Sequence, residues 1–202
     1  MTNSDDAPLR PRPTGSRWEE ILEAATAEFR DHGYEGANVR EIATRVGMLK
    51  GSLYNYISGK ADLFVAVVEK PAMQLLEGVE ALADDDGSSS EKLRKLVRLE
   101  VDIFSEHYPS PFVYLARVQE PLDPRFQEWD ERYFEAVKRL LQSGVDRGEF
   151  HGNLDVEITA RALLGMLAWM LNWYEPRGTA ADDRIVEAFS SMIESGVTKS
   201  PS

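Results

Sequence analysis

The 202-residue chain contains no cysteine. This absence excludes disulfide bonds, zinc sites built from thiolates and catalysis by a cysteine nucleophile. Histidine is also scarce, because the whole sequence has only His32, His107 and His151. We therefore expect no metal site and no cofactor.

Long apolar runs are missing as well. The longest one extends from Ala162 to Tyr174 and includes Asn172, whereas a helix that crosses a bilayer needs about 20 apolar residues. The first 13 residues are polar and contain prolines, so they lack the apolar segment of a secretory signal. The sequence predicts a cytoplasmic protein with no membrane partner.

Positive charge is in short supply, with 23 Lys and Arg against 35 Asp and Glu and a net charge of -12. Taken as a whole, such a chain is repelled by nucleic acid. The deficit is uneven, however, because residues 36–60 contain four Lys or Arg residues and a single Glu. This local excess of positive charge indicates an interaction surface in the N-terminal quarter.

Apolar residues recur at helical spacing along the chain, and no useful length of strand alternation occurs. We predict an all-α fold of about nine helices, interrupted at Gly33, Gly47, Ser58-Gly59 and the polar run 84–90. The later helices are expected over residues 91–107, 111–119, 124–147, 155–175 and 181–195. Before them we expect a flexible arm over residues 1–15 and a first domain over residues 16–60.

Two short helices joined at Gly47, with a supporting helix before them, are typical of a helix-turn-helix. Its second helix enters the major groove of DNA, and Leu53 and Ile57 would anchor that helix to the core. The outward residues would then reach base edges or phosphates. These residues are Lys50, Gly51, Ser52, Tyr54, Asn55, Tyr56 and Lys60. The same pattern also fits a small three-helix core that binds no DNA.

Particular residues of this region carry a family resemblance. They are Ile21-Leu22-Glu23-Ala24-Ala25, Val39-Arg40-Glu41-Ile42-Ala43, Lys50-Gly51-Ser52-Leu53-Tyr54 and Lys60. Together they resemble the DNA-binding domain of tetracycline-repressor (TetR) family regulators. The resemblance implies DNA contacts by Asn38, Arg40, Lys50, Gly51, Ser52, Tyr54, Asn55, Tyr56 and Lys60. The sequence departs from the family pattern at Met48-Leu49, where Val-Ser is usual, so the second short helix lacks a good side-chain N-cap.

The resemblance also implies that residues 61–198 bind a small ligand and form a homodimer. In TetR-like regulators the last two long helices of each subunit build the dimer interface, which here falls on residues 155–175 and 181–195. A two-fold dimer places two recognition helices on a palindromic operator, about 34 Å apart. The alternative is that the apolar residues of both helices only fill the core of the monomer.

Aromatic and basic residues after position 100 are candidates for the ligand pocket. They are Phe104, His107, Phe112, Arg125, Trp129, Trp169 and Trp173. Aromatic residues at helical spacing are also common in an ordinary core, and an arginine often forms only a surface ion pair. Pro124-Arg125-Phe126 and the run from Asn172 to Gly178 resemble TetR regulators of fatty-acid or sterol catabolism that respond to coenzyme A thioesters. This second resemblance implies a largely apolar effector such as an acyl-CoA-like thioester.

The sequence thus predicts a ligand-responsive transcriptional regulator, most simply a repressor that its effector releases from operator DNA. The alternative is a helical protein that binds a small molecule, or an enzyme, without operator binding. No nucleophile–base pair, metal-ligand spacing or phosphate loop occurs in the sequence. We therefore expect no enzymatic activity.

Overall fold

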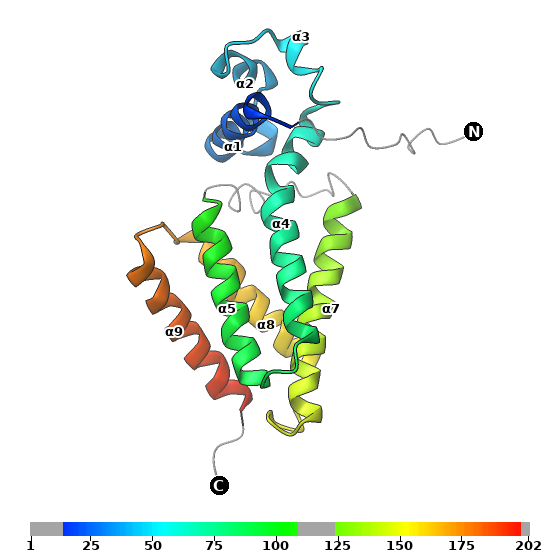
Figure 1. Cartoon of the computed structure of the whole chain (residues 1–202), viewed down its shortest axis with the longest axis vertical. Coiled ribbons are helices and arrows are strands. Elements are labelled where there is room, and N and C mark those ends of the chain that lie inside the picture. Colours follow the sequence, from blue (N-terminus) through cyan, green and yellow to red (C-terminus); the bar gives the residue numbers. More distant parts are fainter. Residues whose placement is uncertain (1–13, 109–123, 199–202) are drawn as a thin grey trace, which may run out of the picture. The chain divides into compact units, whose positions relative to one another are not determined.

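The computed structural model describes residues 14–108 and 124–198, except for the side chain of Leu171. These residues form eight α-helices and one short 3-10 helix, and they contain no strand (Figure 1). The predicted all-α fold is confirmed. The helix expected over residues 111–119 and most of the arm expected over residues 1–15 lie outside the described residues.

The chain divides into two compact units, Met1–Val67 and Val68–Ser202. The first unit contains three helices, α1 (Ser16–Gly36), α2 (Val39–Arg45) and α3 (Lys50–Leu53), and the start of α4 (Lys60–Asp84). The second unit contains the rest of α4 and the remaining helices. These are α5 (Ser89–Glu106), α7 (Pro124–Asp146), α8 (Val156–Trp169), the 3-10 helix η1 (Met170–Asn172) and α9 (Thr179–Val197).

The first unit is built on a small apolar core. Ile21, Ala25 and Phe29 are spaced by four residues, so they share one face of α1, and all three are fully buried. The ring of Phe64 meets the ring of Phe29 edge to face at a centroid distance of 5.1 Å. This contact explains why the first turns of α4 belong to the first unit.

Two predicted turns in the first unit depend on glycine. Gly33 interrupts the helical backbone of α1 with a φ of 67°, and Gly47 joins α2 to α3 with a φ of 66°. Both values lie in the left-handed region, which side chains with a Cβ rarely adopt. The turn at Gly47 therefore sets the direction in which α3 leaves α2.

In the second unit α5 lies between α9 and α7 (Figure 1), and it packs against both. α7 in turn packs against α8. Residues 85–88, which lie within the polar run 84–90 where a break was predicted, separate α4 from α5. The Ser88 side chain accepts a hydrogen bond from the N–H of Glu91 at the start of α5. Of the helices in the described ranges, none combines the length and the apolar character needed to cross a membrane.

Candidate DNA-binding surface and effector-binding unit

The recognition helix α3 is held to the first unit by two apolar anchors. Leu53 is fully buried and Ile57 is 2% exposed, so the predicted anchoring role of both residues is confirmed. Because these side chains point inward, most of the residues between and before them are left on the outside. The helix is short, and its position is set by this packing rather than by its own hydrogen bonds.

The outward side of α3 and of the turn that follows it, residues 50–56, carries most of the predicted DNA contacts. Lys50, Gly51, Tyr54 and Asn55 are exposed, and Ser52 is half-buried. The ammonium group of Lys50 lies 5.9 Å from the centroid of the Tyr54 ring. The structure thus brings together a cation, a flat hydroxyl-bearing ring and an amide, which are suited to phosphates and base edges.

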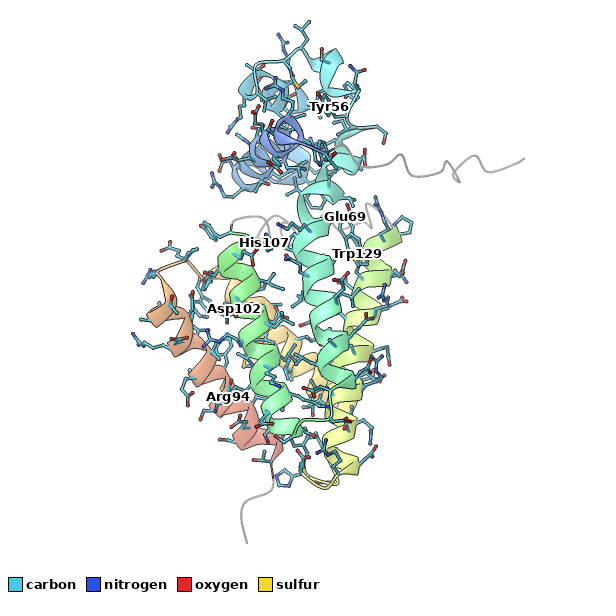
Figure 2. All side chains as sticks on the ribbon, in the orientation of Figure 1. Tyr56, Glu69, Arg94, Asp102, His107 and Trp129 are labelled. Carbon is cyan, nitrogen blue, oxygen red and sulfur yellow. The ribbon has the colours of Figure 1, made fainter. Side chains whose placement is uncertain are left out.

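Two other predicted DNA contacts also make contacts within the first unit. The ring of Tyr56 stacks on Trp18 at a centroid distance of 6.5 Å (Figure 2 labels Tyr56). Lys60 donates from Nζ to the carbonyl oxygens of Glu35 and Ala37, at 3.1 Å in each case. Lys60 therefore ties α4 to the connection between α1 and α2, and its Nζ also lies 4.6 Å from the centroid of the Tyr34 ring.

The start of α2 holds the remaining two predicted DNA contacts. The Asn38 side chain caps the helix, since its Oδ1 accepts a hydrogen bond of 2.9 Å from the N–H of Arg40, and both residues are exposed. Behind them lies Glu28, which is 2% exposed. It accepts a hydrogen bond of 3.2 Å from the N–H of Asn38, and its other oxygen lies 3.2 Å from Arg45.

Sequence reasoning missed Glu28 as a residue that supports this surface. A signal was present, because Glu28 is seven residues after Ile21 on the buried face of α1, where the helical period calls for an apolar side chain. A carboxylate at such a position needs buried partners. Two of its partners, the N–H of Asn38 and the guanidinium of Arg45, belong to the helix-turn-helix. The third is Nδ1 of His32 on α1, at 3.4 Å.

Several predicted effector contacts lie at one end of the second unit, where Figure 2 shows His107, Glu69 and Trp129. Phe104 and Trp129 are buried. The His107 ring is hydrogen-bonded to the side chain of Gln74, and burial lowers the pKa of His107. Arg125 lies 3.4 Å from Glu69 in a partly buried ion pair.

Sequence reasoning also missed a polar pair between α5 and α7, which lies one helical turn from Phe104 and Trp129. Tyr133 on α7 donates a hydrogen bond from its hydroxyl to the buried carboxyl group of Glu100 on α5. Glu100 precedes Phe104 by four residues, and Tyr133 follows Trp129 by four. Burial raises the pKa of Glu100 to about 7, although the hydrogen bond from Tyr133 opposes that shift.

The other predicted effector contacts are placed differently. Trp169 is 66% exposed and Trp173 is 48% exposed, so both lie on the surface of the described chain. The Trp173 ring meets Phe189 of α9 edge to face, at a centroid distance of 6.3 Å. Phe112 lies outside the described residues.

A helix-turn-helix with an exposed recognition helix, followed by a separate helical unit, defines the class of DNA-binding regulators with an effector domain. Two family models match this chain. One, described as bacterial regulatory proteins of the tetR family, matches residues 21–67. The other, described as the tetracyclin repressor-like C-terminal domain, matches residues 86–197. The chain belongs to the TetR family of transcriptional regulators.

Individual relatives agree with this assignment. The chain is 27% identical over 198 residues to the HTH-type transcriptional repressor KstR2 of Mycolicibacterium smegmatis. The matched segment covers 96% of this chain and 97% of that protein. The solved structure of the ketosteroid transcriptional regulator KstR2 of Mycobacterium tuberculosis superimposes with a TM-score of 0.83 at 23% identity, covering 93% and 98% of the two chains. AibR, solved in complex with isovaleryl coenzyme A and operator DNA, has a TM-score of 0.73 at 24% identity, with 88% and 97% covered.

Family membership settles the class of function. The chain is a ligand-responsive, DNA-binding transcriptional regulator and not an enzyme. Regulators of this family bind operator DNA and small-molecule effectors, and they form dimers.

In residues 14–108 and 124–198, no group of three or more His, Asp or Glu side chains is arranged to hold a metal ion.

Proposed function

We propose that the chain is a homodimeric repressor that binds a palindromic operator through residues 16–60 and leaves it when a small, largely apolar effector binds residues 61–198. The observation that carries this proposal is the outward face of residues 50–57, which comprise α3 and the turn after it. That face presents Lys50, Tyr54 and Asn55 to solvent while Leu53 and Ile57 are buried. Anchors on one side and polar groups on the other are what insertion into a major groove requires.

The proposed DNA contacts divide by role. Asn55 is suited to pair with an adenine edge, and Lys50 to reach a guanine or a phosphate. Tyr54, Tyr56, Ser52 and Lys60 would bind phosphate oxygens and fix the register, and Gly51 would let the backbone approach the DNA. Asn38 and Arg40, exposed at the start of α2, would contact the adjacent backbone.

Apolar surface on the last two helices supports a dimer interface there. On α8 the exposed residues Ile158, Ala162, Gly165 and Trp169 form one stripe with helical spacing. On α9 the corresponding positions are Ile185, Phe189, Met192 and Gly196, of which Met192 is 55% exposed. Exposed apolar stripes of this kind mark association surfaces, and a glycine in each would let the partner helix come close.

An effector contact is proposed where Phe104, His107, Arg125 and Trp129 lie, at the end of the second unit that also holds Glu69. Trp169 and Trp173, which are exposed, fit the dimer surface better than this interior region. AibR was solved with isovaleryl coenzyme A, and this thioester is therefore the first probe to test here.

The effector can release DNA only if it binds more tightly to the form of the dimer that does not fit the operator. The recognition helices must lie about 34 Å apart to enter successive major grooves. α4 is the element through which we expect the effector to act, because it runs from the first unit into the second.

DNA binding is tested with the full-length chain and duplexes enriched by it from a random library. We expect palindromic sequences to be enriched, and Lys50→Ala to weaken their binding in a fluorescence anisotropy titration. Lys95→Ala is the matched control, because it removes one exposed positive charge from α5 in the second unit. Equal losses from both variants would contradict the proposed DNA-binding surface.

The dimer interface is tested by light scattering on two neighbouring variants. Met192→Lys places a charge in the apolar stripe of α9 and should yield monomers. Ser191→Lys, at an exposed position on a different face of the same helix, should leave the dimer intact. A Met192→Lys protein that stays dimeric would exclude the last helix from the interface.

Effector release is tested by adding isovaleryl coenzyme A and longer acyl thioesters to the protein–operator complex. We expect at least one thioester to weaken operator binding, and Trp129→Ala to reduce that response while the affinity for DNA stays the same. If the thioester that binds the free protein most tightly leaves operator affinity unchanged, the release mechanism is wrong.

A further inference from the structure

Leu49, the residue immediately before α3, is 80% exposed, which makes it the most exposed large apolar side chain of the described residues. It lies at the N-cap position of the recognition helix with extended backbone angles. Lys50, the next residue, and Tyr54 are exposed as well. A leucine in such a setting gains nothing from burial in the protein.

Besides exposing apolar surface, a leucine at position 49 deprives α3 of an N-cap hydrogen bond. A helix gains stability when the N-cap side chain accepts a hydrogen bond from its first turn, as Asn38, Ser88 and Asp155 do for α2, α5 and α8. Leucine has no acceptor, and α3 has no side-chain cap. A serine at position 49 would cap the helix and would remove the exposed apolar surface. Departures from local stability of this kind occur mainly at functional sites.

The backbone holds Leu49 in a fixed place. Its carbonyl oxygen accepts hydrogen bonds from the N–H of Ser52 at 2.9 Å and from that of Leu53 at 3.3 Å. Since the Leu53 side chain is fully buried, the start of α3 is tied to the core. Leu49 therefore presents its side chain from a fixed point on the surface that carries Lys50 and Tyr54.

In the major groove, the 5-methyl group of thymine is the apolar group that a side chain can contact, and the first residues of a recognition helix reach base edges. We propose that Leu49 is a specificity-determining residue that packs against the 5-methyl group of a thymine in each operator half-site. The inference rests on the proposed DNA-binding surface and adds an apolar contact to its polar ones. It also accounts for the exposed apolar side chain and the missing N-cap of α3, because the leucine is covered only when DNA is bound.

The experiment removes the methyl group from the DNA rather than from the protein. In a duplex enriched by the full-length chain, each thymine is replaced in turn by deoxyuridine, in both half-sites together, and the Kd is measured by fluorescence anisotropy. We expect one position at which the loss of both methyl groups raises the Kd about 15-fold, since one buried methyl group is worth about fourfold in each half-site. Leu49→Ala should bind the thymine and uracil duplexes equally, whereas Asn55→Ala should still distinguish them.

Leu49→Ser provides a readout that does not depend on DNA. It restores a capping side chain, so we expect a higher midpoint temperature of unfolding together with loss of the preference for thymine. If no thymine position responds to loss of the methyl group, or if Leu49→Ala or Leu49→Ser still distinguishes the two duplexes, the role of Leu49 is wrong although operator binding stands. If the chain enriches no duplex at all, the proposed function fails with it.

Discussion

Each of the two units buries a glutamate, and the two environments differ. Glu28 in the first unit lies 3.2 Å from the guanidinium of Arg45 and accepts a hydrogen bond from the N–H of Asn38. Glu100 in the second unit has the hydroxyl of Tyr133 as its hydrogen-bond donor. The first carboxylate is thus compensated by a cation, whereas the second is paired with a neutral group.

The difference matches what each unit has to do. Reading base edges requires a helix held in one position, and Glu28 joins α1 to the start of α2 through fixed polar contacts. A buried carboxyl group without a cation instead costs stability whenever it is ionised. Glu100 lies one turn from Phe104 and Trp129, which are two of the proposed effector contacts.

The largest expected effect is a pH-dependent loss of stability caused by Glu100. Its pKa is about 7 in the folded chain against an ordinary value of 4.5 for a glutamate, so the folded state binds the proton more tightly than the unfolded state. The free energy of unfolding therefore falls as pH rises from about 4.5 to about 7, and it levels off on either side. The full loss corresponds to about 3 kcal/mol.

Glu100→Gln isolates this contribution. The amide keeps an acceptor for Tyr133 and cannot ionise, so the stability difference between Glu100→Gln and the wild type should grow in favour of the variant across this pH range. Chemical denaturation at a series of pH values measures it. Glu91→Gln, at an exposed position in the first turn of the same helix, is the control and should follow the wild type. Parallel curves for Glu100→Gln and the wild type would refute the role of Glu100.

A smaller loss of unfolding free energy is expected when Glu28, whose buried charge is compensated by Arg45, is removed. Glu28→Ala leaves the N–H of Asn38 without its acceptor and Arg45 without its partner, so we expect a loss of about 2 kcal/mol in unfolding free energy. Operator affinity should fall as well, because the start of α2 is no longer held. Glu28→Gln keeps the acceptor for Asn38 and should recover part of both losses. An alanine variant with unchanged operator affinity would show that Glu28 does not position the DNA-binding surface.

The sequence was sufficient for the parts of the structure that depend on local pattern. Gly33 and Gly47 produce the predicted turns because their positive φ angles suit glycine. Leu53 and Ile57 are buried because their spacing places both on the inner face of the recognition segment. Such features follow from neighbours within a few positions along the chain.

The unpredicted features depend on residues that are distant in sequence. Arg125 and Glu69 are 56 positions apart, and nothing in the periodicity of either helix specifies that they meet. The exposure of Trp169 was also hidden, because an apolar stripe looks the same whether it faces the core of its own chain or a second subunit. Which aromatic residues line an interior region depends on which faces of the helices pack together.

The smallest loss of unfolding free energy, about 1 kcal/mol, is expected for Lys60→Ala. Lys60 combines a structural role in the first unit with a proposed contact to DNA. Two of its N–H groups hold the carbonyl oxygens of Glu35 and Ala37, and the third is proposed to bind a phosphate. Lys60→Ala should therefore weaken binding to all DNA sequences and reduce the slope of log K against log salt by about one for each subunit. Lys50→Ala is the comparison, since Lys50 is exposed and its loss should change DNA binding with little effect on unfolding. If Lys60→Ala destabilises the protein but leaves the salt slope unchanged, Lys60 only supports the first unit and binds no phosphate.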